Sequence, residues 1–119
     1  MRAIYKICGA AEWAEAYRTG TFGGSDIDRR DGFIHFSTRD QAGETAARYF
    51  SSLDDLVLVM VDADVLGHRL KWEPARGGAL FPHLYSQLVT AAAIWVKDLA
   101  GRRGPRVILG QVADGLTSQ

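Results

Sequence analysis

Three short segments of the 119-residue chain carry side chains that could bind or transform a small molecule. The first is 33–37, Phe-Ile-His-Phe-Ser, which predicts a strand with Phe33, His35 and Ser37 on one face. An imidazole beside a hydroxyl can hold a phosphate or a ribose, or move a proton. A core histidine bonded to a backbone carbonyl is the evenly weighted alternative.

The second segment, 72–78, combines an aromatic ring, a carboxylate, a guanidinium and two adjacent glycines. Arg76 could clamp a phosphate through two parallel N–H groups. The glycines would let a ligand approach backbone N–H groups. An ordinary glycine turn with an exposed ion pair explains the same residues about equally well.

The third segment, 81–85, reads Phe-Pro-His-Leu-Tyr. A rigid aromatic wall of this kind suits a small planar ligand, and aromatic packing beneath the sheet is the alternative. All three segments lie at strand ends or in short extended stretches, where pockets are commonly built. We therefore expect a ligand pocket formed by 31–37 and 72–85.

Other chemistries find less support. Cys8, His35 and His83 lack the spacing of metal ligands, so no metal site is predicted, and Cys8 is interpreted as a small buried apolar residue. The glycines of 20–24 are too few for a phosphate-binding loop. Three carboxylates crowd one loop and are interpreted as solvated: Asp26, Asp28 and Asp31.

Composition narrows the class of protein. Fourteen basic residues balance fourteen acidic ones, which argues against an extended nucleic-acid surface. The single cysteine fits a reducing compartment. The longest strongly apolar runs, 56–61 and 91–96, are far shorter than the roughly 20 residues of a membrane helix. With no signal peptide visible, we expect a cytoplasmic protein without a membrane partner.

The pattern along the chain predicts one α+β domain over 1–113 and a disordered tail over 114–119. Helices are expected at 10–18 and 38–50, with a long loop at 20–32 between them. A continuous β-branched run at 56–61 indicates a central, buried strand. The other predicted strands are 2–8, 33–37, 70–73, 93–97 and 106–109.

Several of these segments resemble a known family. Ile4-Tyr5-Lys6-Ile7, 31–38, Trp72-Glu73-Pro74 and 78–85 are similar to the uncharacterised bacterial family called domain of unknown function nine-five-two. The resemblance spans roughly residues 3–99. It identifies a family without identifying an activity.

A more distant similarity concerns the RNA 2′-phosphotransferases of the ADP-ribosyltransferase fold group. Tyr5 would lie in their first strand, His35 in the second and 57–62 in the central strand. The resemblance implies a small split β-sheet with two N-terminal helices and a cleft for NAD or an ADP-ribosylated intermediate. Lys6 and Ile7 stand where that family has a histidine and a glycine, so the fold carries over better than the catalysis.

Together these observations favour a protein that binds a small molecule in a nucleotide cleft of the NAD or ADP-ribose type. No cofactor is required, and NAD is a candidate ligand or substrate. A transferase of the ADP-ribosyl or RNA 2′-phosphotransferase type, or an interaction domain with His35 and Trp72 in its core, are the alternatives. The expected catalytic residues are His35, Glu73 and His83. The expected ligand-binding residues are Tyr5, Lys6, Ser37, Trp72, Arg76, Phe81 and Tyr85.

Overall fold

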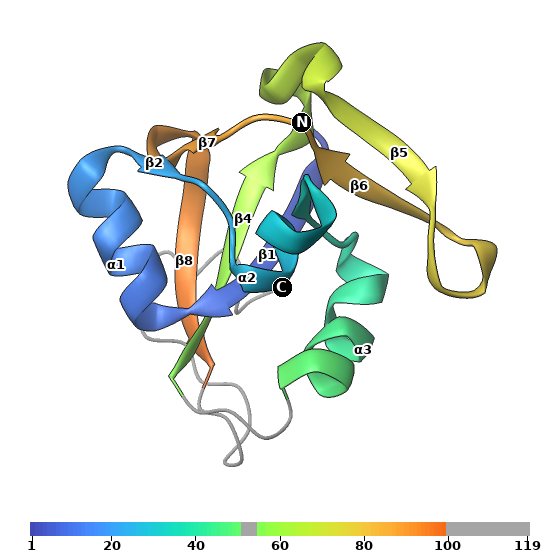
Figure 1. Ribbon diagram of the computed structural model, residues 1–119, viewed down its shortest axis with the longest axis horizontal. Coiled ribbons are helices and arrows are strands. Elements are labelled where there is room, and N and C mark those ends of the chain that lie inside the picture. Colours follow the sequence, from blue (N-terminus) through green and yellow to red (C-terminus); the bar gives the residue numbers. More distant parts are fainter. Residues whose placement is uncertain (51–54, 100–119) are drawn as a thin grey trace.

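A computed structural model of the chain describes residues 1–50 and 55–99, which Figure 1 draws in colour apart from the thin grey trace. The predicted strand 106–109, the tail 114–119 and the domain end at residue 113 lie outside the described residues.

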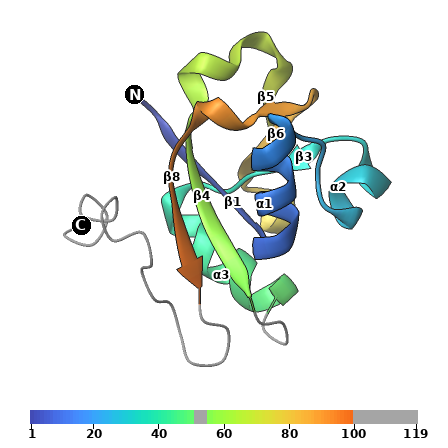
Figure 2. The ribbon, with the colours of Figure 1, turned by 90° about the vertical axis from the view of Figure 1, so that its left-hand side faces the viewer.

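The first sheet contains three antiparallel strands in the order β1-β4-β8: β1 (Ala3–Gly9), β4 (Leu56–Asp62) and β8 (Ala93–Leu99). The β-branched run of β4 occupies the centre, as predicted. In the view of Figure 1, α1 (Ala10–Thr19) and α3 (Arg39–Phe50) lie to either side of this sheet. Figure 2 views the sheet from the side of α1.

The second sheet, ordered β3-β6-β5, is smaller: β3 (Ile34–His35), β6 (Leu80–Leu84) and β5 (Leu70–Pro74). A single antiparallel bridge between Tyr5 and Ser37, with two N–H···O bonds of 2.8 Å, joins it to the edge of β1. A two-stranded ribbon pairs β2 (Thr21–Phe22) with β7 (Leu88–Val89). The α+β class is thus confirmed, with small antiparallel sheets.

Short 3₁₀ turns link several of these strands. They are η1 (Ala63–Arg69), η2 (Arg76–Gly78) and η3 (Thr90–Ala92). The η1 turn begins after Asp62, whose carboxylate accepts a 3.0 Å hydrogen bond from the Asp64 N–H.

The long loop predicted over 20–32 is wrong, because it contains helix α2 (Asp26–Asp31). The Ser25 N–H donates to the Asp28 carboxylate at 2.8 Å, which fixes the start of the helix. Gly32 ends it with φ at 87°, a left-handed conformation that favours glycine. The described residues therefore contain three α-helices before residue 51, where two were expected. None of these helices has the length and apolar character needed to cross a membrane.

The main core fills the space between the first sheet, α1 and the second sheet. Ile4, Val59 and Val61 have no exposed surface, and Phe36, which directly follows β3, is 2% exposed in the same cluster. Cys8 lies in this core as predicted, and burial raises the pKa of its thiol to about 12. The second sheet is thereby anchored through Phe36 and the Tyr5–Ser37 bridge, which gives the residues around His35 a rigid support.

Candidate functional site

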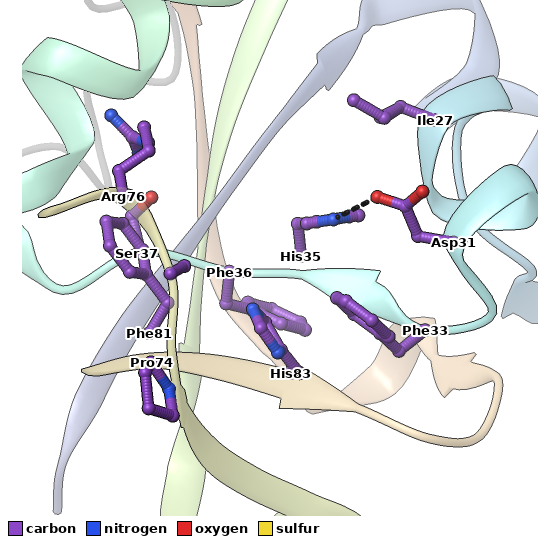
Figure 3. A pocket seen from close by; sticks show the side chains of 11 residues that line it. Ile27, Asp31, Phe33, His35, Phe36, Ser37, Pro74, Arg76, Phe81 and His83 are labelled. Atoms are coloured by element: carbon purple, nitrogen blue, oxygen red, sulfur yellow. Dashed lines mark hydrogen bonds and ion pairs between the residues drawn. The ribbon is translucent and has the colours of Figure 1, made fainter. Parts of the chain in front are cut away.

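A pocket of about 300 Å³ opens between α2, the segment around β3 and the β5–β6 hairpin. Figure 3 shows Arg76 and Asp31 at opposite ends of it, with His35 between them in this view. The lining residues are Ile27, Asp31, Phe33, His35, Phe36, Ser37, Pro74, Ala75, Arg76, Phe81 and His83. The pocket thus lies where residues 31–37 and 72–85 predicted it.

Asp28 holds His35 in position from beneath the pocket. Its Oδ1 lies 2.6 Å from His35 Nδ1 and accepts a 3.0 Å bond from the His35 backbone N–H. His35 Nε2 lies 3.0 Å from an oxygen of Asp31 at the pocket rim. Both imidazole nitrogens therefore face carboxylates, and these contacts fix the orientation of the ring.

A buried ion pair accounts for the presence of Asp28 in the interior. Lys6 Nζ lies 2.7 Å from Asp28 Oδ2 and donates to the His35 carbonyl at 3.1 Å, and the two charged side chains are only 4% and 1% exposed. Burial acts to raise the pKa of Asp28, but the bonds from His35, Lys6 and the Ser25 N–H outweigh it, and the pKa falls to about 2. Asp28 is therefore a carboxylate throughout the physiological range.

His83 is held by a second carboxylate. Glu73 Oε1 lies 2.7 Å from His83 Nδ1 and accepts a 2.7 Å bond from the Tyr85 hydroxyl. Hydrogen bonds from His83 and then Tyr85 lower the pKa of Glu73, and the same carboxylate raises the pKa of the Tyr85 phenol. Since Glu73 accepts from Tyr85 as well, its position beside His83 is well defined.

The two imidazoles belong to one aromatic cluster. His35 and His83 pair directly across β3 and β6, and their ring centroids are 5.5 Å apart. The Phe33 ring stacks on His83 at 4.0 Å and lies 4.5 Å from His35. This cluster forms a wall with apolar ring faces and nitrogen atoms at its edges.

Arg76 brings a guanidinium from the η2 turn, and its Nη1 lies 3.8 Å from an oxygen of the exposed Glu44 carboxylate. Its guanidinium donates to Thr45 Oγ1 at 2.6 Å and lies over the Phe81 ring, 4.6 Å from the centroid. Thr45 in turn shares a 2.9 Å hydrogen bond with the Ser37 hydroxyl. These contacts place a planar cation and a hydroxyl on the same part of the pocket wall, where they could meet an anion.

The structure brings together most of the residues predicted from the sequence. His35, Ser37, Arg76, Phe81 and His83 line the pocket. Glu73 and Tyr85 contact His83 directly or through each other, as described above.

Three predicted residues lie elsewhere. Lys6 lies beneath the pocket, where it supports Asp28. Tyr5 packs its ring against Trp95 at 5.9 Å, and Trp72 lies under the Arg2 guanidinium at 4.1 Å. None of the three is among the lining residues.

Sequence reasoning missed Asp28 and Thr45. The interpretation of Asp28 as a solvated loop residue is wrong, because it is 2% exposed and forms the centre of the His35 network. One signal was available: Ser25 and Asp28 have the serine-x-x-acid spacing of a capping box, which predicts a helix start there. No comparable pattern marks Thr45, which reaches the site only through the fold.

Gly24 is expected to be sensitive to substitution because it abuts this network. Its φ is 109°, and an added Cβ would lie 2.7 Å from the Asp28 Cβ. We expect Gly24→Ala to destabilise the protein by more than about 2 kcal/mol through backbone strain and displacement of Asp28. Gly20→Ala is the matched control, since Gly20 has φ at 98° but nothing within 4 Å of the added carbon. Urea unfolding of both variants measures the difference in the free energy of unfolding. Equal losses in the two variants would show that the contact between Gly24 and Asp28 has no special effect on stability.

Comparisons with known proteins give a family and leave the activity open. Residues 7–96 match the family model described as "Protein of unknown function (DUF952)". None of the curated proteins matches the chain. The chain is similar to the crystal structure of protein CC0527 from Caulobacter crescentus, with 46% identity, a TM-score of 0.82, and coverage of 93% of this chain and 98% of that one.

The solution structure of CC0527 gives a consistent result. It shares 47% identity over 93% of this chain and 96% of that one, with a TM-score of 0.76. The family model covers most of the chain and confirms the sequence resemblance over residues 7–96. The chain therefore belongs to the DUF952 family of proteins of unknown function.

Proposed function

We propose that the pocket binds a small phosphate-bearing molecule of the nucleotide class, with NAD and ADP-ribose among the candidates. The observation that carries this proposal is the position of the Arg76 guanidinium and the Ser37 hydroxyl on a pocket wall shared with two imidazoles and aromatic rings. A guanidinium offers paired N–H donors with the geometry of phosphate oxygens. The aromatic cluster offers apolar faces to a planar base.

The pocket size limits what can enter. A volume of about 300 Å³ lies at the lower end of small-molecule sites. A mononucleotide-sized moiety fits this range better than a whole dinucleotide does. The ligand is therefore expected to place one phosphate near Arg76 and its planar group toward the cluster of Phe33, His35 and His83.

Affinity for adenosine monophosphate is expected to exceed affinity for adenosine by at least about tenfold, because only the nucleotide can form charge-assisted hydrogen bonds with Arg76. Isothermal titration calorimetry of both compounds measures the ratio. Nicotinamide, NAD, ADP-ribose and 2′-phosphorylated nucleotides complete the panel. Equal affinities across phosphorylated and unphosphorylated compounds would contradict phosphate recognition.

A specific observation favours a second candidate, group transfer by acid–base catalysis of the ADP-ribosyl or RNA 2′-phosphotransferase type. Each pocket imidazole has its Nδ1 beside a carboxylate, His35 beside Asp28 and His83 beside Glu73. A carboxylate in this position orients an imidazole for proton transfer. In this account His83 exchanges protons with the substrate and Glu73 positions it, while His35 takes part only where the substrate replaces Asp31 at its Nε2.

The test of the catalytic candidate is turnover. Incubation with NAD and with 2′-phosphorylated RNA, followed by chromatography of nicotinamide and phosphorylated products, distinguishes an enzyme from a binding protein. Product formation that is lost in His83→Gln would support catalysis. Saturable binding without product in either assay would contradict catalysis and support a non-catalytic binding protein.

A further inference from the structure

A second pocket adjoins the candidate pocket and shares Phe33 with it. This adjoining pocket has a volume of about 350 Å³ and lies between the residues flanking α2 and the turn that follows β6. Its polar groups come from Arg29 of α2, from Tyr85 and from Ser86 and Gln87 in the turn. Phe33 is thus common to the linings of the two pockets, and its ring lies against His83 on one side and near Tyr85.

Two nitrogen groups converge within the adjoining pocket. A Cβ placed on Gly23 would lie 3.9 Å from Gln87 Nε2 and 4.0 Å from Arg29 Nη2. The Arg29 guanidinium and the Gln87 amide therefore approach the same point from different elements. Both are hydrogen-bond donors, and together they form an arrangement suited to oxygen atoms of an anion.

The charges around the adjoining pocket also favour an anion. The Asp28 carboxylate lines it, but this group is bound to Lys6, to His35 and to the Ser25 N–H. The neighbouring arginine, Arg30, pairs with Asp31 at 2.9 Å. Arg29 instead lines the adjoining pocket and provides its positive charge.

We infer that the adjoining pocket is a second anion subsite, and that the ligand is a nucleotide carrying a second phosphate. This inference rests on the proposed function, because it assigns the first phosphate to the candidate pocket. One phosphate lies at Arg76 and the second at Arg29 and Gln87, with the body of the ligand against Phe33. The Tyr85–Glu73–His83 hydrogen bonds link the walls of the two pockets, since Tyr85 lines the adjoining pocket and His83 the candidate pocket.

Calorimetric titration of the whole chain with adenosine monophosphate, adenosine 2′,5′-bisphosphate and adenosine 3′,5′-bisphosphate tests the inference. At least one of the two-phosphate compounds should bind about tenfold or more tightly than the monophosphate, as expected for an added charge-assisted contact. Arg29→Met should abolish that gain and leave monophosphate affinity unchanged. Arg18→Met, an exposed arginine of α1 outside both pockets, is the matched control.

The outcomes distinguish the second anion subsite from the proposed phosphate binding at Arg76. A two-phosphate gain that survives in Arg29→Met, or no gain at all, would overturn the second subsite and leave phosphate binding at Arg76 intact. Absence of binding by every nucleotide would overturn the proposed function and the subsite together. Gly23→Ala provides an independent check, because its Cβ would occupy the point where Arg29 and Gln87 converge. It should weaken only the two-phosphate compounds.

Discussion

Replacing Asp28 with asparagine is expected to lower the free energy of unfolding by about 3–5 kcal/mol, as is typical when one partner of a buried ion pair is removed. The substitution keeps the shape of the side chain but leaves the Lys6 ammonium, 4% exposed, without its counter-charge. It also weakens the contact that orients His35. Guanidinium unfolding measures the loss.

Two comparisons make this test specific. Asp26→Asn changes an exposed carboxylate of the same helix and should cost less than about 0.5 kcal/mol. The Lys6→Met/Asp28→Asn double variant should be more stable than the sum of the two single losses predicts, because it removes the uncompensated charge. A cost for Asp28→Asn no larger than that for Asp26→Asn would contradict the central role of this ion pair.

The Asp28 carboxylate also determines how the stability of the fold depends on pH. The folded-state pKa of Asp28 is about 2, below its ordinary value of 3.8. Since the folded state favours the carboxylate, the stabilisation is fully present above about pH 4 and is lost as the pH falls toward 2. Asp28→Asn should flatten the acid limb of the stability curve between these values.

Replacing Arg76 with methionine is expected to reduce affinity for nucleotide phosphates by about 10- to 100-fold, the range of one or two charge-assisted hydrogen bonds. Methionine retains much of the apolar contact with Phe81 and removes the guanidinium. Arg76→Lys should be intermediate, because a lysine keeps the charge without the planar pair of donors. Arg18→Met on α1 is again the control, and calorimetry measures all three. Unchanged affinity in Arg76→Met would remove the basis of phosphate recognition.

The location of the pocket could be predicted from the sequence because strand periodicity is a short-range property. Alternation placed Phe33, His35 and Ser37 on one face, and the structure brings all three to one pocket. By the same rule the side chains of Trp72 and Glu73 lie on opposite faces of their sheet, because consecutive strand residues point to opposite faces. The same holds for Tyr5 and Lys6 in β1. Glu73 pairs with Phe81, which lies on the same face of β6 as His83, whereas Trp72 pairs with Pro82 on the opposite face. Of these two neighbours, Glu73 is therefore the one that can reach His83.

Other features depended on contacts that a local pattern does not encode. Helix α2 has six residues, too few for a hydrophobic period to emerge, and its start is set by a serine and an aspartate. The Lys6–Asp28 pair joins β1 to α2 across 22 positions of sequence. Thr45 reaches Arg76 across 31 positions. Polar pairs between residues so far apart in the sequence cannot be predicted from a local pattern, because they depend on how the elements pack in three dimensions.

The most direct test of the account is a nuclear magnetic resonance titration of isotope-labelled protein with adenosine monophosphate, using adenosine as the control. Nucleotide binding in the candidate pocket should give saturable shifts that converge on Ser37, Arg76 and the imidazole resonances of His35 and His83, with smaller changes for adenosine. Shifts absent from these residues, or confined to α1 far from the pocket, would contradict nucleotide binding at this site.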